Sequence, residues 1–176
     1  MKFFYADSFD AVDPNYDFLV NHPDPTRNRQ RDDVFAHEIL GQSPYHGILL
    51  SYATVGAGNS VNRLSDGQHK RLIREGVREF YRFPYTGYNG DPERYPIMGD
   101  SGSFSSRGTI PSITIDQLLD FYQTCRFTHG VSLDSVITEK KTKWDDTRRL
   151  PVEVDAKAVF TLEKAREFLA LHRKRK

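Results

Sequence analysis

Strand-like apolar runs alternate along this chain with helices that carry their own start signals, and this alternation restricts the fold more than any other feature. Residues 47 to 55 form a mostly apolar run, which is typical of a strand covered on both faces. Ser65 precedes Gln68 by three residues, a capping-box spacing that predicts the start of an amphipathic helix. Thr114 and Gln117 repeat this spacing before a second predicted helix.

Further strands are predicted at residues 79 to 83, 97 to 100 and 130 to 137, and residues 33 to 40 resemble a helix. Strands and helices that alternate at this spacing favour a parallel α/β sheet with right-handed crossovers, either open or curved towards a barrel. In both geometries, ligands bind at the carboxyl ends of the strands. We therefore expect the functional residues to follow the strands.

The composition indicates an ordinary soluble domain and excludes several classes of protein. The chain has 176 residues, of which 38% are hydrophobic and 28% are charged, and its formal net charge is only +1. We expect one domain over residues 1 to 176, without a global basic field for nucleic acid. No apolar run is long enough to span a membrane, so we expect no membrane partner. The lone Cys125 cannot form an internal disulfide or a cysteine zinc cluster, which favours the cytoplasm.

Residues 97 to 104, Ile-Met-Gly-Asp-Ser-Gly-Ser-Phe, are the strongest candidate for a site. A carboxylate at Asp100 could carry a proton or bind a polar ring edge, while Gly102 lets a flat ligand approach the backbone. Phe104 offers a face for stacking. Structural roles are also open: Asp100 as the cap of a loop, Ser101 as a partner of nearby backbone, and Phe104 as a core aromatic.

The same residues also resemble the Gly-Asp-Ser-Gly sequence around the nucleophile of chymotrypsin-like serine proteases, in which Ser101 would attack. Those proteases are β-barrels, usually secreted and disulfide-bonded. A chain with one cysteine and clear helical patterns does not match that context.

Two flanking regions differ from the predicted core. Residues 21 to 33 form a basic arm with prolines, in which Arg27, Arg29 and Arg31 could contact phosphates or could simply be solvated. Residues 138 to 160 are charged and irregular. A helix is predicted from Thr161 to about residue 173, with an apolar face formed by Leu162, Ala165, Phe168 and Leu169.

The motif and its neighbours resemble a known enzyme family. Residues 98 to 104 are similar to the Asp-Ser-Gly-Gly-Phe/Tyr-Gln motif of the tRNA-guanine transglycosylases, and Gly-Val-Ser-Leu-Asp134 is similar to the segment with a second base-recognising aspartate. The arm at 24 to 33, the run Arg-Glu-Gly-Val-Arg-Glu-Phe at 74 to 80 and the Trp-Asp-Asp segment at 144 resemble the DpdA-type paralogues, which are associated with 7-deazaguanine modification of DNA. The resemblance extends from Phe3 to His172.

The resemblance implies a (β/α)₈ barrel that exchanges a guanine in nucleic acid for a 7-deazaguanine base through a covalent aspartate–sugar intermediate, as in retaining glycoside transfer. It implies that Asp100 handles a proton and contacts the base, with Ser101 and Gly102 shaping the pocket. It also implies that Phe104 stacks on the base. Asp134 would accept hydrogen bonds from the guanine-like edge.

The departures from the family pattern lead to further expectations. The predicted strands amount to about half of a barrel of about 250 residues. The resemblance assigns the nucleophilic aspartate and the zinc site of the family to the other half of the barrel. We therefore expect no cofactor and no metal in this chain. Ser103 stands where the tRNA enzymes have a second glycine. DNA is the preferred substrate, with tRNA as the alternative. The possible partners are a complementary C-terminal half or a second copy, and a non-catalytic base-binding or nucleic-acid-binding remnant stays open.

Overall fold

The fold is built on a four-stranded parallel sheet in which the strands follow one another in chain order. The computed structural model describes residues 1–6, 11–28, 31–56, 64–85, 95–106, 113–137 and 151–175. The strands, in their spatial order, are β1 (Phe4–Ala6), β4 (Gly47–Ser51), β5 (Ile97–Asp100) and β6 (His129–Gly130). A parallel sheet whose strands are added successively at one edge is the arrangement of a (β/α) barrel segment. The expected α/β class is therefore confirmed, and the sheet is compatible with a partial barrel.

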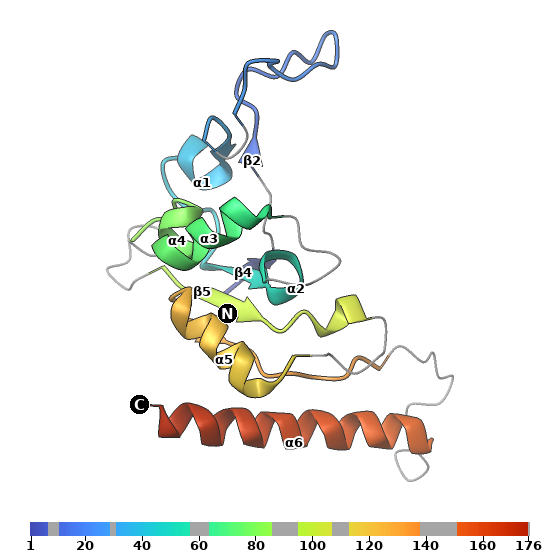
Figure 1. The fold of residues 1–176 in the computed structure, drawn as a ribbon. Helices are drawn as coiled ribbons and strands as arrows, with labels where there is room; N and C mark the ends of the chain where they lie inside the picture. The colour runs from blue at the N-terminus through green and yellow to red at the C-terminus, as the bar shows by residue number, and fades with distance from the viewer. Residues whose placement is uncertain are drawn as a thin grey trace.

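Helices separate the strands, and a small antiparallel pair lies beside the sheet (Figure 1). The helical segments are α1 (Ala36–Ile39), α2 (Tyr52–Val55), α3 (Asp66–Glu75), α4 (Val77–Phe80), the 3₁₀ turn η2 (Ser103–Ser106), α5 (Ile115–Thr124) and α6 (Val152–Lys174). The antiparallel pair is β2 (Ala11–Val12) and β3 (Val34–Phe35). In Figure 1, α6 runs alongside α5 at the end of the molecule farthest from β2.

The two predicted capping boxes are present and define the starts of the two central helices. The hydroxyl of Ser65 accepts the Gln68 backbone N–H, and the Gln68 side chain accepts the Ser65 N–H in return. Thr114 and Gln117 make the same reciprocal pair at the start of α5. Both caps satisfy backbone donors that a helix cannot pair internally, so local sequence alone determines where these helices begin.

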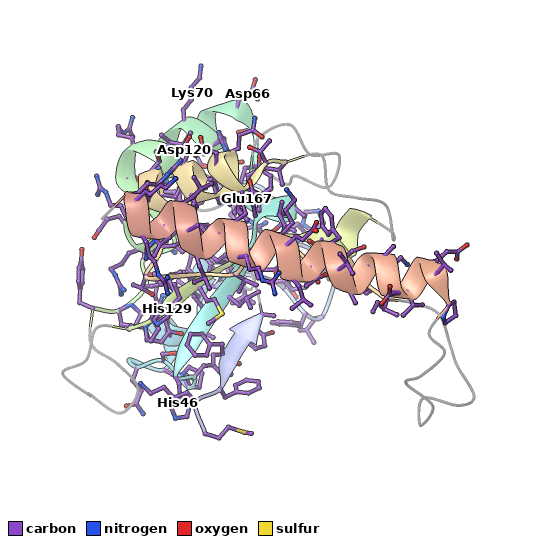
Figure 2. The ribbon with its side chains drawn as sticks, turned by 90° about the horizontal axis from the view of Figure 1, so that it is seen from below. His46, Asp66, Lys70, Asp120, His129 and Glu167 are labelled. Carbon is purple, nitrogen blue, oxygen red and sulfur yellow. The ribbon has the colours of Figure 1, made fainter. Side chains whose placement is uncertain are left out.

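The two faces of the sheet differ in burial. Ile48, Leu50 and Ile97 are 8%, 0% and 0% exposed and point towards the helices, whereas their neighbours Leu49 and Met98 point to the opposite face and are half-buried. Figure 2 shows the labelled residues of α3 and α5 on the side of the molecule away from His46 and His129. The helices of this chain therefore cover one face of the sheet, as the outer helices of a (β/α) barrel do.

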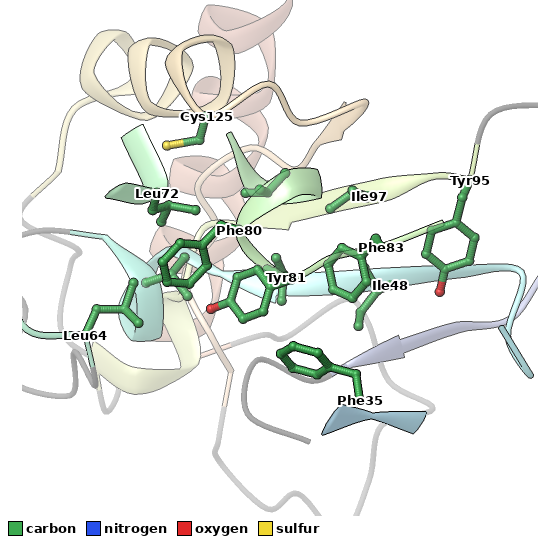
Figure 3. Packing of buried hydrophobic residues seen from close by; sticks show 13 residues of the cluster. Phe35, Ile48, Leu64, Leu72, Phe80, Tyr81, Phe83, Tyr95, Ile97 and Cys125 are labelled. Atoms are coloured by element: carbon green, nitrogen blue, oxygen red, sulfur yellow. The ribbon is translucent and has the colours of Figure 1, made fainter. Parts of the chain in front are cut away.

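An aromatic-rich cluster fills the space between the sheet and the helices (Figure 3). Phe80, Tyr81, Phe83 and Tyr95 are all at most 5% exposed, and the rings of Tyr81 and Phe83 are stacked with centroids 5.5 Å apart. Cys125, at the end of α5, is fully buried in the same cluster. Aromatic side chains bury large areas, so this cluster anchors the helices against β4 and β5.

Two predicted strands are wrong in part or in whole. The apolar run at 47 to 55 ends as a strand at Ser51, because the Ser51 hydroxyl caps the helical turn α2 by accepting the Ala53 N–H. Residues 79 to 83 are not a strand: Glu79 and Phe80 end the short helix α4, and Tyr81 and Arg82 form a turn. A short apolar run shows that a segment is buried, but not whether it is strand or helix.

The remaining boundaries also differ from expectation. In the segment 33 to 40, which was predicted to be a helix, Val34–Phe35 form the strand β3 and the helix α1 covers Ala36–Ile39. β6 stops at Gly130. The alternation of the predicted strand puts Val131, Leu133 and Ser135 on one face, and Leu133 and Ser135 are buried whereas Val131 is 36% exposed. Asp134 therefore lies after a strand and not within one.

The C-terminal helix begins earlier than predicted and turns different residues inward. α6 starts at Val152, inside the segment predicted to be irregular, of which residues 138 to 150 lie outside the described residues. Ala165 and Phe168 are half-buried as expected, whereas Leu162 and Leu169 are 59% and 51% exposed. In the described part of the chain, no helix is both long enough and apolar enough to cross a membrane.

Candidate functional site

The carboxyl ends of β4 and β5 bring polar residues together, as the sequence predicts for a parallel sheet. Ser51 and Asp100 are direct neighbours in the register of the two strands, and both point to the face opposite the helices. Figure 1 shows α2 and the turn η2 on the side towards which both strand arrows point. The half-buried Asp100 carboxylate therefore lies at the edge where parallel sheets bind their ligands.

The turn after β5 is tight and depends on glycine. Gly102 has a φ of +77°, and its N–H donates to the Asp100 carboxylate at 2.9 Å. A side chain at this position would place its Cβ 2.6 Å from the Ala53 Cβ and 2.7 Å from the Ala53 nitrogen. The turn therefore packs directly on the first turn of α2, and one carboxylate oxygen of Asp100 caps it.

Ser101 connects this turn to Asp134, which lies 33 residues further along the chain. The Ser101 Oγ is 3.3 Å from the Asp134 Oδ1 and 2.9 Å from the Ser103 Oγ, and the Asp134 N–H donates to the Ser103 Oγ at 3.4 Å. Both serines are 3% exposed. Thus the structure brings Asp100, Ser101, Gly102 and Asp134 into one group, in which the Ser101 hydroxyl bonds the side chains of Ser103 and Asp134.

Phe104 lies on the 3₁₀ turn that follows, and its side chain is 78% exposed. An exposed aromatic next to a group of carboxylates and hydroxyls is a surface on which a flat ring could stack. The alternative of a core aromatic is therefore wrong for Phe104.

Tyr122 supports the site from the helix side, although sequence reasoning assigned it only to the apolar face of a helix. Its ring lies against the backbone of β5 and β6, because a Cβ at Gly99 or Gly130 would come within 2.3 or 2.5 Å of it. Its hydroxyl donates to the Val131 carbonyl at 3.0 Å. Burial raises the pKa of Tyr122, and the nearby Asp100 charge adds to that shift. The two glycines, one on each strand, were the available sequence signal for this close approach.

The three predicted phosphate contacts have different surroundings. Arg27 is enclosed by two carboxylates, with nitrogens 3.1 Å from Asp13 and 3.1 Å from Asp33, and its side chain is 15% exposed. This pairing ties the arm to β3 and accounts for Arg27 without a nucleic acid. Arg31 pairs with Asp32 but its side chain is 71% exposed. Arg29 lies outside the described residues.

The structure gives no support for a metal in the part of the chain that it describes. No three histidine, cysteine or acidic side chains converge there in a way that could hold an ion. The zinc site of the family is rich in cysteines, whereas Cys125 is the one cysteine of the sequence and is fully buried in the core. Cys125 therefore does not fit the zinc site of the family.

Comparison with known proteins finds a relative for most of this chain. No protein-family model matches the chain. The chain is 36% identical, over 139 residues, to a DNA-guanine transglycosylase from Salmonella montevideo. The matched region covers 78% of this chain but 31% of that relative, so the chain spans about a third of the length of the curated relative that it matches. Most of this chain is thus similar to one segment of a protein with that name, and its sheet has the strand order of a (β/α) barrel segment.

Proposed function

We propose that this chain carries the base-recognition site of a guanine transglycosylase that exchanges guanine in DNA for a 7-deazaguanine base. The observation that carries the proposal is the connection of the Asp100 turn to Asp134 through Ser101, whose Oγ is 3.3 Å from the Asp134 carboxylate. Asp100 ends β5, Asp134 follows β6, and the exposed Phe104 is the residue after Ser103 in the chain. Carboxylate acceptors beside a stacking surface suit a purine with N–H donors on its edge.

In this proposal each residue has a separate task. Asp134 accepts hydrogen bonds from the N–H groups of the base, and Phe104 stacks on its ring. Asp100 contacts the base and handles the proton of the base that leaves or enters, while Ser101 and Gly102 shape the floor of the pocket. The covalent chemistry that the resemblance implies also needs a nucleophilic carboxylate at the sugar, and we assign that role to no residue of this chain.

DNA is the proposed substrate, and tRNA is the alternative. The support comes from the relative, whose printed name is DNA-guanine transglycosylase. The basic arm would contribute phosphate contacts through Arg31, whose side chain is largely exposed, and Arg29. The role proposed for Arg27 is different: its two ion pairs hold the arm in position for such contacts.

The proposal is tested by incubating the purified chain with a labelled 7-deazaguanine precursor and either duplex DNA or tRNA. Incorporation by the wild type supports the proposal, and the nucleic acid that takes up label identifies the substrate. Asp100→Asn should abolish incorporation but retain most of the DNA affinity, because phosphate contacts dominate that affinity. Glu163→Gln removes an exposed carboxylate of α6 and is the matched control, so it should keep full incorporation. Unchanged incorporation by Asp100→Asn would remove Asp100 from the mechanism.

A second candidate is a base-binding module that needs a complementary chain for catalysis. It is favoured by the half-buried apolar residues Leu49 and Met98 on the face opposite the helices. For this candidate, the folded chain binds the base but incorporates no label and forms no covalent DNA adduct. Measuring the molecular mass in solution then distinguishes a dimer of this chain from a monomer that requires another protein.

A further inference from the structure

We infer that Ser103 is a positioning residue that orients Asp134 through a closed ring of hydrogen bonds and thereby sets the preference for purines with N–H donors on the edge. The inference rests on the proposed function and extends it to a residue at which the motif departs from the family, because the tRNA enzymes have glycine there. Ser103 lies at the start of η2 and is 3% exposed.

The direction of each hydrogen bond in the ring follows from counting protons. The Asp134 carboxylate can only accept, so the Ser101 hydroxyl donates to its Oδ1 over 3.3 Å. That donation uses the single proton of Ser101, and the 2.9 Å bond between the two serines must therefore be donated by Ser103. The Ser103 oxygen in turn accepts the Asp134 N–H over 3.4 Å.

The ring begins and ends on one residue, passing from the Asp134 N–H through two hydroxyls to the Asp134 carboxylate. Both hydroxyls donate once and accept once, an arrangement in which successive hydrogen bonds strengthen one another. The bonds to Asp134 are long, and bonds of this kind commonly shorten when a ligand binds. Ser103 thus restrains both the backbone and the carboxylate of Asp134.

This restraint leaves one oxygen of Asp134 for a ligand. Within the described parts of the chain, no hydrogen bond engages the Oδ2 of Asp134, and the residue is half-buried. An ionised oxygen held in a fixed direction accepts strongly from N–H groups of a purine edge, and the site is left with an unpaired acceptor when the purine lacks them. A 2-amino-6-oxopurine or its 7-deaza analogue presents two adjacent kinds of N–H donor, at N1 and at the 2-amino group, whereas the same ring without the amino group presents N1–H alone, so the geometry favours the former.

The test compares the binding of free 7-deazaguanine and 7-deazahypoxanthine by calorimetry, because binding does not require the chain to be catalytically complete. Wild type should bind 7-deazaguanine more tightly. Ser103→Ala breaks the ring, and we expect its 7-deazaguanine affinity to fall about tenfold, equivalent to about 1.4 kcal/mol, with less than about a twofold change for 7-deazahypoxanthine. Ser103→Gly should behave in the same way.

The matched control is Ser43→Ala. Ser43 is also buried, 4% exposed, and its hydroxyl bonds Tyr95 in the core away from the site. This variant loses a buried serine hydroxyl with a comparable effect on stability, and it should keep the wild-type ratio of the two affinities. A Ser103→Ala variant that keeps this ratio overturns the role of Ser103 while the proposed function stands.

A second measurement needs no ligand. Hydrogen exchange at the Asp134 amide should accelerate in Ser103→Ala and stay unchanged in Ser43→Ala, because only Ser103 accepts from that amide. Unaltered Asp134 exchange would show that the ring does not restrain this residue and would overturn the inference. If folded wild type binds neither base, the proposed function fails, and the inference about Ser103 fails with it.

Discussion

The turn that carries Asp100 offers a quantitative test of how the site is built, through the substitution Gly102→Ala. Gly102 has a φ of +77°, and an added Cβ would meet the Ala53 Cβ at 2.6 Å and the Ala53 nitrogen at 2.7 Å. Gly41 has a similar φ of +67°, but a Cβ there would meet nothing within 4 Å. Gly41→Ala therefore measures the backbone cost alone, and Gly102→Ala measures that cost together with the close approach.

The left-handed conformation costs an L-residue about 1–2 kcal/mol, so Gly41→Ala should lower the free energy of unfolding by about that amount or slightly less. At Gly102 the backbone of α2 must also move, and overpacking of this kind costs about 1–3 kcal/mol more. The total for Gly102→Ala is then about 2–5 kcal/mol. The unfolded-chain effect of replacing glycine by alanine is the same in both variants and cancels in their difference.

The assay is urea denaturation of the wild type and both variants, followed by circular dichroism. We expect Gly102→Ala to be the less stable of the two by at least about 1 kcal/mol. It should also lose affinity for 7-deazaguanine, because relief of the contact with Ala53 shifts the turn and with it the backbone N–H of residue 102, which donates to the Asp100 carboxylate. Equal stability of the two variants would refute the reasoning, because the contact with Ala53 would then have no energetic consequence.

Two predictions concern the scaffold. Ser65→Ala removes the hydroxyl that accepts the Gln68 N–H at the start of α3, and the free energy of unfolding should fall by about 1 kcal/mol in the same denaturation assay; an unchanged midpoint would contradict the capping role. Burial raises the pKa of Cys125 to about 12, so a thiol reagent at pH 8 should react only after unfolding. Because the unfolded thiol ionises near pH 8.5 and the folded one does not, the stabilisation from Cys125 is complete below about pH 8.5 and is lost as the pH rises towards 12. The stability gap between the wild type and Cys125→Ala should therefore narrow from pH 8 to pH 10, and a constant gap would contradict the shift.

The parts of the fold that sequence analysis predicted correctly depend on local chemistry. The starts of α3 and α5 follow from the reciprocal caps at Ser65 and Thr114, and β5 follows from a short apolar run that ends at Asp100. Leu133 and Ser135 are also buried on one face as predicted, although Val131, predicted on the same face, is exposed. Each of these patterns involves residues within a few positions of one another.

The parts that sequence analysis missed depend on contacts between distant segments. Residues 79 to 83 include Phe80, Tyr81 and Phe83, which pack in the aromatic cluster, and there the segment forms a helix end and a turn instead of a strand. The helical start of α6 at Val152 and the outward side chains of Leu162 and Leu169 were missed in the same way, because packing against α5 decides which face of this helix is buried.

The candidate site shows the same division. The sequence alone determined which residue types are present, that Asp100 ends a strand, and that its motif resembles that of the guanine transglycosylases. Only the tertiary structure decided that Ser103 and Ser101 join Asp134, that Tyr122 lies under Gly99 and Gly130, and that Arg27 is enclosed by Asp13 and Asp33. The difference lies in how far apart along the chain the interacting residues are. Capping and periodicity act between near neighbours, whereas the hydrogen-bond ring joins segments that are distant in the chain and that parallel strand pairing brings together.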